Sequence, residues 1–264
     1  MKLVKIEPPG SWCQYEAIME MLAGVTGRTF VEVGCGSGML SLRLLERGWT
    51  GLGMDFSEAA LEQARINLSA FIADGRYRLV TGNIFELEPP REKFDVGLSI
   101  MVMEHVEDDV GFVRKIAGFV RPGGIIIAGV PGRQDRWGVE DETVGHLRRY
   151  ERRDLEKTLN RAGLTDLVVW SVGVPIVNLL FHFGNFFIRK SSELEKKERS
   201  LSEQTKESGI REIPGKTVFP AWCRLILNRF TLYPFFILQR LFYNTNLGLT
   251  VFARGSVGGK SSPG

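Results

Sequence analysis

The sequence predicts an α/β protein in which a largely parallel sheet is covered by helices. Short β-branched segments alternate with helical patterns through the first two-thirds of the chain, which is the order of a βαβ protein. Of the 264 residues, 44% are hydrophobic and 25% are charged. These proportions fit a globular domain with a sizeable core and exclude a disordered, collagen-like or disulfide-scaffold protein.

Each element follows from a local pattern. The apolar segments that we expect to form strands are 29–33, 50–54, 77–81, 94–100, 124–130 and 167–172. Between them, apolar residues recur at three- and four-residue spacing, which predicts helices at 39–47, 57–69, 107–120 and 152–162. The next strand signal comes only at 247–253.

This spacing divides the chain into four parts. We expect a core at 1–172, a hydrophobic and basic helical insertion at 173–246, a strand at 247–254 that returns to the core, and a flexible tail at 255–264. An insertion of that length must carry structure of its own.

The insertion has two apolar, aromatic stretches, 174–188 and 219–243, separated by a segment of mixed charge. The first is too short and too polar for a membrane span. In the second, Pro234 predicts a kink. When it is projected as a helix, Ile226, Phe230, Ile237 and Leu241 share one side, and Arg224, Asn228, Arg229, Gln239 and Arg240 spread over the other.

Charge is distributed unevenly along the chain. Residues 1–172 hold 21 basic and 25 acidic side chains, whereas residues 173–264 hold 13 and 6. A basic, amphipathic stretch suits the interface of a bilayer with anionic headgroups. We therefore expect peripheral membrane contact through 174–188 and 219–243, with a soluble lid over the substrate as the alternative.

The three cysteines, Cys13, Cys35 and Cys223, form no CxxC pair. This pattern indicates a reducing compartment and no zinc site. The N-terminus meets Pro8 and Pro9 before an apolar run reaches the length of a signal peptide. We expect a cytoplasmic protein, peripheral at the inner face of the membrane if the insertion meets lipid.

A glycine-rich turn between the first strand and helix is the most informative segment. It reads Glu32-Val-Gly-Cys-Gly-Ser-Gly-Met39. A dinucleotide GxGxxG fingerprint would need glycine where Met39 stands, which disfavours NAD. Asp55 ends the next strand, where a carboxylate can accept both ribose hydroxyls of a nucleoside. The pattern describes a nucleoside site without a pyrophosphate cradle.

These motifs resemble those of class I S-adenosylmethionine-dependent methyltransferases, over residues 29–163. Residues 32–38, 53–57, 82–84, 94–106 and 121–124 are similar to the ordered motifs of that family. The resemblance implies a Rossmann-like seven-stranded sheet with the last strand antiparallel and a large helical insertion between strands six and seven. The alternative, ordinary α/β turns, does not account for the order of the motifs.

The resemblance also implies S-adenosyl-L-methionine as the cofactor and assigns residues to it. The glycines border its methionine part, Glu32 helps to hold its amino end, Asp55 binds the ribose, and Phe56 packs on the adenine. Asn83 stands where the family often has Asp. The residues implied to bind the cofactor are Glu32, Gly34, Cys35, Gly36, Gly38, Asp55, Phe56, Asn83, Ile84 and Ser99.

Methyl transfer to a hydroxyl needs alignment and a base, and the sequence offers three candidate catalytic residues. His105 follows the fourth strand, and its alternative role is structural, with Glu104. His146 and Tyr150 follow the fifth strand, and their alternative is a solvated cluster at the start of a helix. Some ubiquinone-biosynthesis O-methyltransferases carry Glu-x-x-Glu-His and are thought to use a divalent metal. Met101 replaces the first carboxylate here, and we expect no metal.

We therefore expect methyl transfer, with O-methylation favoured, to a hydrophobic or lipid-linked small molecule at a membrane surface. The alternatives are a soluble small-molecule methyltransferase and a non-catalytic cofactor-binding scaffold. Residues 98–101 lack the Asn/Asp-Pro-Pro-aromatic set that resembles amino-methylating DNA enzymes, which argues against a nucleic-acid substrate despite the basic tail. The sequence leaves the oligomeric state open.

Overall fold

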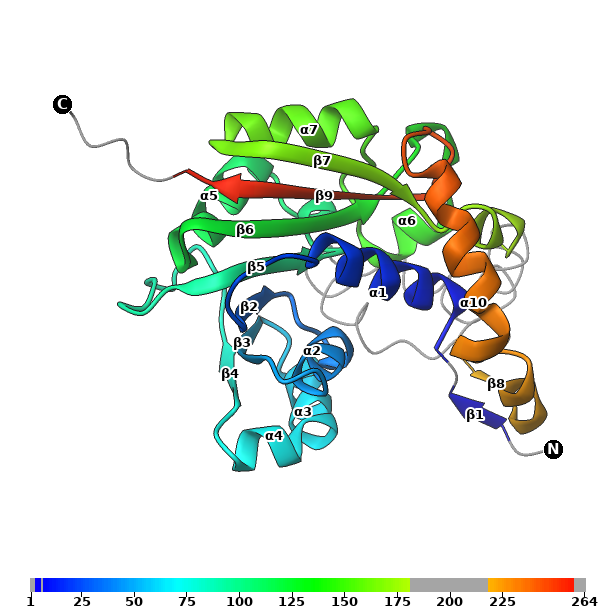
Figure 1. Ribbon diagram of the computed structural model, residues 1–264, viewed down its shortest axis with the longest axis horizontal. Helices are drawn as coiled ribbons and strands as arrows, with labels where there is room; N and C mark the ends of the chain where they lie inside the picture. The colour runs from blue at the N-terminus through cyan, green and yellow to red at the C-terminus, as the bar shows by residue number, and fades with distance from the viewer. Residues whose placement is uncertain (1–2, 6, 181–217, 259–264) are drawn as a thin grey trace.

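A computed structural model describes residues 3–5, 7–180 and 218–258. Its centre is a seven-stranded sheet with the order β4-β3-β2-β5-β6-β9-β7 (Figure 1). The strands of this sheet are β2 (Thr29–Val33), β3 (Thr50–Asp55), β4 (Tyr77–Thr81), β5 (Phe94–Ile100), β6 (Val120–Pro131), β7 (Leu164–Val172) and β9 (Thr250–Val257). The helices are α1 (Pro9–Met21), α2 (Met39–Leu45), α3 (Glu58–Asn67), α4 (Ser69–Ala73), α5 (Asp109–Phe119), α6 (Val139–Val144), α7 (Arg152–Arg161) and α10 (Arg229–Leu238).

The last strand confirms the predicted topology. β9 lies between β6 and β7 and pairs with both in antiparallel register, Ala128 with Ala253 and Val169 with Ala253. All other pairs in the large sheet are parallel. The strand begins at Thr250 and continues to Val257, so it extends into the segment expected to be a tail.

Period-two alternation along the strands separates two hydrophobic cores, one on each face of the sheet. Phe30 packs in the layer formed by α1, α2 and α10, whereas Val31 packs in the layer of α5 and α7. Ile125 and Ile126 alternate in the same way. The carboxyl ends of β2, β3 and β5 therefore meet at one edge, between two covered faces.

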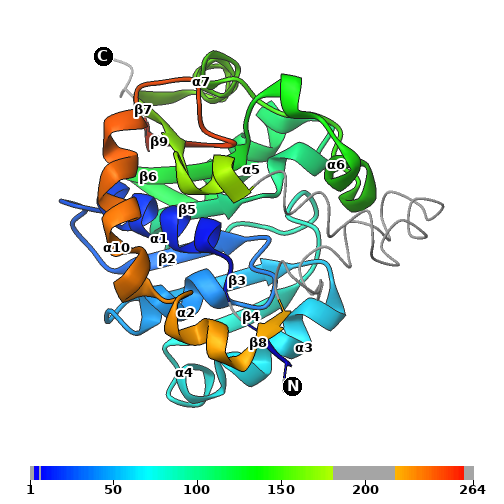
Figure 2. The ribbon, with the colours of Figure 1, turned by 90° about the vertical axis from the view of Figure 1, so that its right-hand side faces the viewer.

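Sequence analysis missed α1 and the strand β1 (Leu3–Lys5), which bring the N-terminal segment against the later part of the insertion. Helix α1 begins with Pro9 at its first position, and β1 pairs with β8 (Val218–Pro220) in antiparallel register. Helix α10 lies beside α1 (Figure 2). The N-terminus and the later part of the insertion thus form one layer over the sheet.

The second apolar stretch, 219–243, is broken into shorter pieces. These are β8, the 3-10 turn η4 (Ala221–Leu225), α10 with Pro234 inside it, and the 3-10 turn η5 (Gln239–Phe242). Most of the first stretch, 181–188, lies outside the described residues. Among the described helices, none has the length and hydropathy that a membrane crossing requires.

Candidate functional site

The glycine-rich turn after β2 is held in left-handed backbone conformations. Gly34, Gly36 and Gly38 have φ values of 76°, 52° and 78°, which favour glycine because other residues strain there. A Cβ on Gly36 would meet no atom within 4 Å, whereas one on Gly38 would lie 2.5 Å from the Leu68 side chain. Gly36 therefore exposes its backbone toward open space, and Gly38 allows α2 to approach α3.

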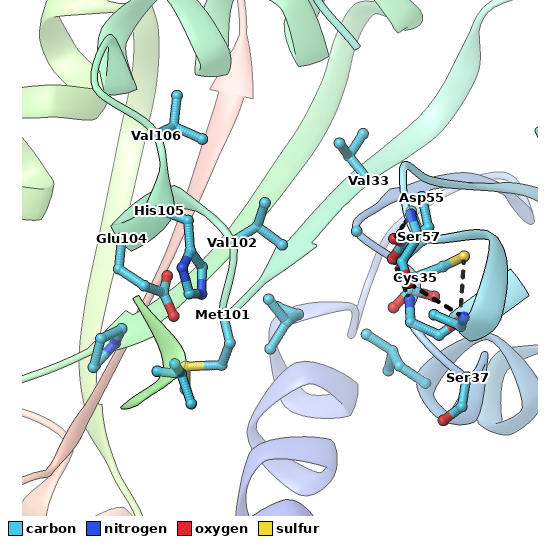
Figure 3. Close-up of a pocket in the computed structure, with 18 of the residues that line it drawn as sticks. Val33, Cys35, Ser37, Asp55, Ser57, Met101, Val102, Glu104, His105 and Val106 are labelled. Carbon is cyan, nitrogen blue, oxygen red and sulfur yellow. Dashed lines mark hydrogen bonds between the residues drawn. The ribbon is translucent and has the colours of Figure 1, made fainter. Parts of the chain in front are cut away.

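Asp55, at the end of β3, fastens this turn. One carboxylate oxygen accepts a hydrogen bond from the Gly36 amide at 2.8 Å, and the other accepts from the Ser57 amide at 2.9 Å. Because β2 and β3 are parallel neighbours, the carboxylate lies beside the glycine turn, as Figure 3 shows. The structure thus brings together the two groups on which the predicted nucleoside site depends.

Glu32 lies deeper than the glycines. It is buried, and one of its carboxylate oxygens accepts from the Ser41 hydroxyl, which is also hydrogen-bonded to the Tyr77 hydroxyl at 2.6 Å. Burial raises the pKa of Glu32 to about 8, although the Ser41 hydrogen bond opposes that shift. Burial also raises the pKa of the neighbouring Cys35 thiol. Burial therefore favours the protonated form of Glu32 when no ligand is bound.

The remaining residues assigned to the cofactor divide into two groups. Phe56, Asn83 and Ile84 line the same cavity as the glycine turn. Phe56 is 40% exposed, and the Asn83 side chain accepts from the Phe85 amide at 3.1 Å. Ser99 is buried and does not line the cavity. Its place on β5 points its side chain into the interior of the protein.

One large cavity joins the glycine turn to the turn after β5, with a volume of about 1400 Å³. Its lining includes apolar side chains from four segments: Ile18, Val144, Val177 and Leu249. That volume exceeds what one nucleoside occupies, since ligand pockets for drug-sized molecules span about 300–1,000 Å³. The cavity can therefore hold a cofactor and an apolar acceptor together.

The turn after β5 carries two of the polar side chains at the far end. Met101 has a φ of 58°, an unusual value for a residue with a Cβ, and its amide donates to the Gly129 carbonyl at 2.7 Å. The chain then turns through the 3-10 helix η1 (Met103–His105). This strained turn places Glu104 and His105 against the cavity (Figure 3).

His105 and His146 come together although they follow different strands. Their ring centroids are 4.9 Å apart in an edge-to-face arrangement. The His105 Nδ1 atom is 3.0 Å from the Gly145 carbonyl oxygen. Burial lowers the pKa of His105 to about 4, and the adjacent His146 adds to the effect. His105 is therefore a neutral imidazole across the physiological range.

Sequence analysis missed the residues behind His146. Asp141 is fully buried on α6, and one of its oxygens accepts from His146 Nδ1 and from Arg149 Nε, each at 2.7 Å. Burial alone would raise the pKa of Asp141, but hydrogen bonds from His146, Arg149 and the Gly138 amide outweigh burial and lower it. The available signal was an acidic residue five positions before a histidine, but the burial of that residue is visible only in the structure.

Tyr150 lies away from the acceptor region. It is buried and does not line the cavity, and its hydroxyl donates to Asp109 at 3.0 Å. Burial and the nearby Asp109 carboxylate raise its pKa. The structure thus brings His105 and His146 to one place, whereas Tyr150 ties the segment after β6 to α5.

Comparison with known sequences identifies the central part of the chain. Residues 31–128 match the family model described as a methyltransferase domain. The chain is 36% identical over 100 residues to the ubiquinone biosynthesis O-methyltransferase of Stutzerimonas stutzeri, covering 38% of this chain and 43% of that protein. The corresponding protein of Alkalilimnicola ehrlichii is 34% identical over 111 residues, covering 42% and 44%. The chain therefore spans less than half the length of these relatives.

Solved structures share the fold over a longer stretch. The phosphoethanolamine N-methyltransferase 2 of Haemonchus contortus, in complex with S-adenosyl-L-methionine, is 18% identical, with a TM-score of 0.60 over 96% of this chain and 54% of that one. The cyclase SpnF is 16% identical, with a TM-score of 0.55 over 91% and 80%. The Rossmann-like fold and the family resemblance predicted from the motifs are confirmed, and the fold alone is compatible with more than one reaction.

Proposed function

We propose that this chain, which contains a methyltransferase domain, transfers the methyl group of S-adenosyl-L-methionine to a hydroxyl of a hydrophobic or lipid-linked acceptor at a membrane surface. The observation that carries the proposal is the single cavity that joins the Gly36 and Asp55 pair to the two histidines. One end suits the cofactor, and the other suits an apolar acceptor with a polar reacting atom.

The residues at the first end fit the cofactor. Gly36 has open space where a Cβ would stand, so a ligand can approach its backbone closely. Asp55 would accept the ribose hydroxyls, and the exposed Phe56 ring would pack on the adenine. Glu32 would meet the amino group, and a cationic amine beside this carboxyl would favour its ionised form.

The residues at the second end fit the acceptor. When bound, S-adenosyl-L-methionine supplies a methyl group on a sulfonium, and transfer to oxygen forms one C–O bond, breaks one C–S bond and releases the hydroxyl proton. The protein must orient the acceptor, exclude water and receive that proton. His105 and His146 are the candidates for the polar task, and the apolar wall of Ile18, Val144 and Leu249 would hold the acceptor.

A set of exposed apolar side chains supports the membrane part of the proposal. Phe230, Tyr233 and Ile237 recur at three- and four-residue spacing on α10, and Ile226 and Leu241 lie on the flanking turns. We call these five residues the α10 patch. Phe230 is 81% exposed and Leu241 is 76% exposed. An apolar helix face of this kind suits insertion among lipid headgroups.

One of the arginines, Arg240, contributes differently from the sequence-based expectation, and so does Gln239. Arg240 forms an ion pair with Glu20 of α1 at 2.9 Å, and Gln239 is buried. These two side chains hold α10 to the core instead of facing headgroups. Membrane binding would then depend chiefly on the apolar side chains of the α10 patch.

The first experiment incubates the protein with methyl-labelled S-adenosyl-L-methionine and a whole extract of its own cell, then partitions the products. Label in the organic phase supports the proposed acceptor. Label confined to small aqueous products favours a soluble methyltransferase with the insertion as a lid. Cofactor binding with no label in any fraction favours the scaffold. An Asp55→Ala variant, run in parallel, identifies background transfer.

The second experiment measures flotation with anionic vesicles. Phe230→Ser and Leu241→Ser should each reduce the bound fraction, because each removes an apolar side chain that would enter the interface. Ile66→Ser is the matched control, since Ile66 is 62% exposed on α3, outside the patch. Equal flotation of all three variants and the wild type would argue against the membrane part while leaving methyl transfer untouched.

A further inference from the structure

His146 has a buried carboxylate close to each of its two ring nitrogens. Asp141 lies 2.7 Å from Nδ1. On the other side, Glu104 Oε1 lies 3.7 Å from Nε2, which is too far for a hydrogen bond. Glu104 is 0% exposed, and neither of its side-chain oxygens has a hydrogen-bond partner among the described residues. Because a carboxylate is costly to bury without a partner, this arrangement favours a positive charge on the His146 ring.

Asp141 determines which nitrogen of His146 can receive a proton. Gly145, with a φ of 77°, follows α6 and turns the chain back, so that the His146 amide donates to the Asp141 carbonyl at 2.9 Å. The ring then reaches the Asp141 carboxylate, whose pKa is lowered by the hydrogen bonds that it accepts. An ionised carboxylate only accepts hydrogen bonds, so in a neutral ring the proton lies on Nδ1 and the lone pair on Nε2.

The Asp141 carboxylate is itself held firmly. Arg149 Nε donates to the oxygen that also binds His146, at 2.7 Å, and the Gly138 amide donates to the other oxygen at 2.8 Å. Arg149 also donates to the carbonyl of Gly132, directly after β6, at 2.9 Å. Asp141 and Arg149 are both buried. The orientation of the His146 ring is therefore fixed to the end of the sheet.

His146 is the member of this group that an acceptor can reach. It lines the cavity, and its side chain is 12% exposed, whereas the oxygens of Glu104 have almost no exposed surface. His105 lines the cavity as well, but its Nδ1 atom lies beside the Gly145 carbonyl, an uncharged group. Positive charge is therefore better stabilised on His146 than on His105.

We propose that His146 is the catalytic residue that receives the acceptor proton on Nε2, and that Asp141 and Glu104 are its positioning residues. This inference rests on the proposed function, because it assigns roles within that reaction. Asp141 would orient the ring and select its tautomer. Glu104 would stabilise the ring once it is protonated.

The charges balance along this route. A lone pair of the acceptor oxygen forms the C–O bond, the C–S bond breaks with its electron pair going to sulfur, and the hydroxyl proton passes to His146 Nε2. The positive charge thus moves from the sulfonium to an imidazolium that lies between two carboxylates. Burial raises the pKa of Glu104 to about 8, and a cation beside this group favours its ionised form. Water takes the proton from the ring after the product leaves.

The first test determines the tautomer of His146 and needs no acceptor. The chain has three histidines, so nitrogen NMR of their rings, with His105→Gln and His182→Gln variants for assignment, identifies each one. We expect the His146 proton on Nδ1 and no proton on Nε2 at the pH of the transfer assay. A proton on Nε2, alone or together with one on Nδ1, would overturn the proposal, because that nitrogen could not accept another.

The second test is chemical rescue, with methyl-labelled S-adenosyl-L-methionine and the organic-soluble extract of the protein's own cell as the source of acceptor. His146→Ala should slow transfer by about 10²–10⁴-fold, and added imidazole should restore part of the rate. His105→Ala is the matched comparison, because its ring lies 4.9 Å away in the same cavity, and imidazole should not restore its rate. Rescue of His105→Ala alone, or a loss below about tenfold in His146→Ala, would overturn the assignment.

Two further variants test the positioning residues. Asp141→Asn should slow transfer by more than about tenfold and remove the preference for a proton on Nδ1, while S-adenosyl-L-methionine binding is kept. Glu104→Gln should slow transfer but keep the tautomer, because it faces the other nitrogen. Glu107→Gln is the control, since Glu107 lines the same cavity outside this group. Wild-type rates and tautomer in Asp141→Asn would overturn its role, and a wild-type rate in Glu104→Gln would overturn that of Glu104.

Failure of this inference is distinguishable from failure of the proposed function. If the wild type transfers no label to any fraction, the result counts against the function, whereas the expected tautomer in the same protein still supports the positioning by Asp141. If the wild type transfers label and His146→Ala does so equally well, the function stands and the inference is overturned.

Discussion

Gly34 and Val102 are in direct contact, and this contact joins the two ends of the candidate site. A Cβ on Gly34 would lie 2.3 Å from the nearer methyl group of Val102. Gly34 belongs to the turn proposed to hold the cofactor, and Val102 lies in the turn that presents Glu104 and His105. The absence of a side chain at Gly34 therefore sets how closely the methyl donor and its acceptor can be placed.

Gly34→Ala should weaken cofactor binding by more than about tenfold and destabilise the protein. The new methyl group would overpack Val102, which costs about 1–3 kcal/mol, and φ of 76° adds about 1–2 kcal/mol for a residue with a Cβ. Urea unfolding and titration calorimetry measure the two effects. Adding Val102→Ala should recover the packing cost but not the backbone cost; no recovery would show that the contact is not limiting.

Gly36→Ala separates the two causes, because Gly36 has a φ of 52° and open space at its Cβ position. We expect a cost in stability of about 1–2 kcal/mol from the backbone alone and a further loss in cofactor affinity, since the methyl group would occupy the space where the ligand approaches. Unchanged affinity in this variant would show that the cofactor does not lie against Gly36.

Asp55→Ala should reduce cofactor affinity by about 10- to 150-fold, because a hydrogen bond to a charged partner contributes about 1.5–3 kcal/mol. The same change frees the Gly36 and Ser57 amides. Asp74→Ala is the control, since Asp74 is an exposed carboxylate at the end of α4 that pairs with Arg76. Equal affinities of the two variants would exclude Asp55 from the ribose site.

Most of the sheet and the cofactor end could be predicted from the sequence, because their signals are local. A strand, a glycine turn and a helix follow one another directly around Gly36, and Asp55 ends the next strand. Such segments are predicted from the spacing of apolar residues and from the residue types that favour turns, and both are read from residues that are neighbours in the sequence. The family resemblance added the order of the strands, including the antiparallel β9.

The acceptor end could not be assembled in the same way. The sequence paired Glu104 with His105 and gave no signal that sets Asp141 apart from a surface acid, and only the fold buries both and sets His146 between them. The projection of 219–243 as one helix was wrong for a related reason. A projection along one helix cannot register that η4 and η5 interrupt it, or that Gln239 points into the core.

Glu32 should make the stability of the ligand-free protein fall between about pH 4.5 and pH 8. Burial raises its pKa from 4.5 to about 8, so the folded state binds a proton that the unfolded state releases in this window. The associated stability is fully present below pH 4.5 and lost as the pH rises through 8. The slope contributed is roughly 1.4 kcal/mol per pH unit at most.

Glu32→Gln tests this sign, because an amide remains neutral. Glu104 also has a pKa raised to about 8 by burial, whereas His105, with a pKa lowered from 6.5 to about 4, gives a slope of the opposite sign below about pH 6.5. The variant should therefore lose about half of the slope between about pH 6.5 and pH 8. Urea unfolding across this range gives the comparison. An unchanged slope would show that Glu32 is already ionised in the folded protein.

Gln239 should contribute more to stability than any residue of the α10 patch. Its side-chain amide donates to the Cys13 carbonyl and accepts from the Gly173 amide, each at 3.1 Å, in a fully buried position. Gln239→Leu would leave the buried Gly173 amide without its partner and remove the second hydrogen bond of the Cys13 carbonyl, which lies inside α1, and the unpaired amide alone costs about 1–3 kcal/mol. Leu241→Ser, two residues on but 76% exposed, should change the unfolding free energy by less than about 0.5 kcal/mol. Thermal and urea unfolding would compare the two, and similar losses would mean that α10 packs on α1 through its other side, leaving no apolar face for a membrane.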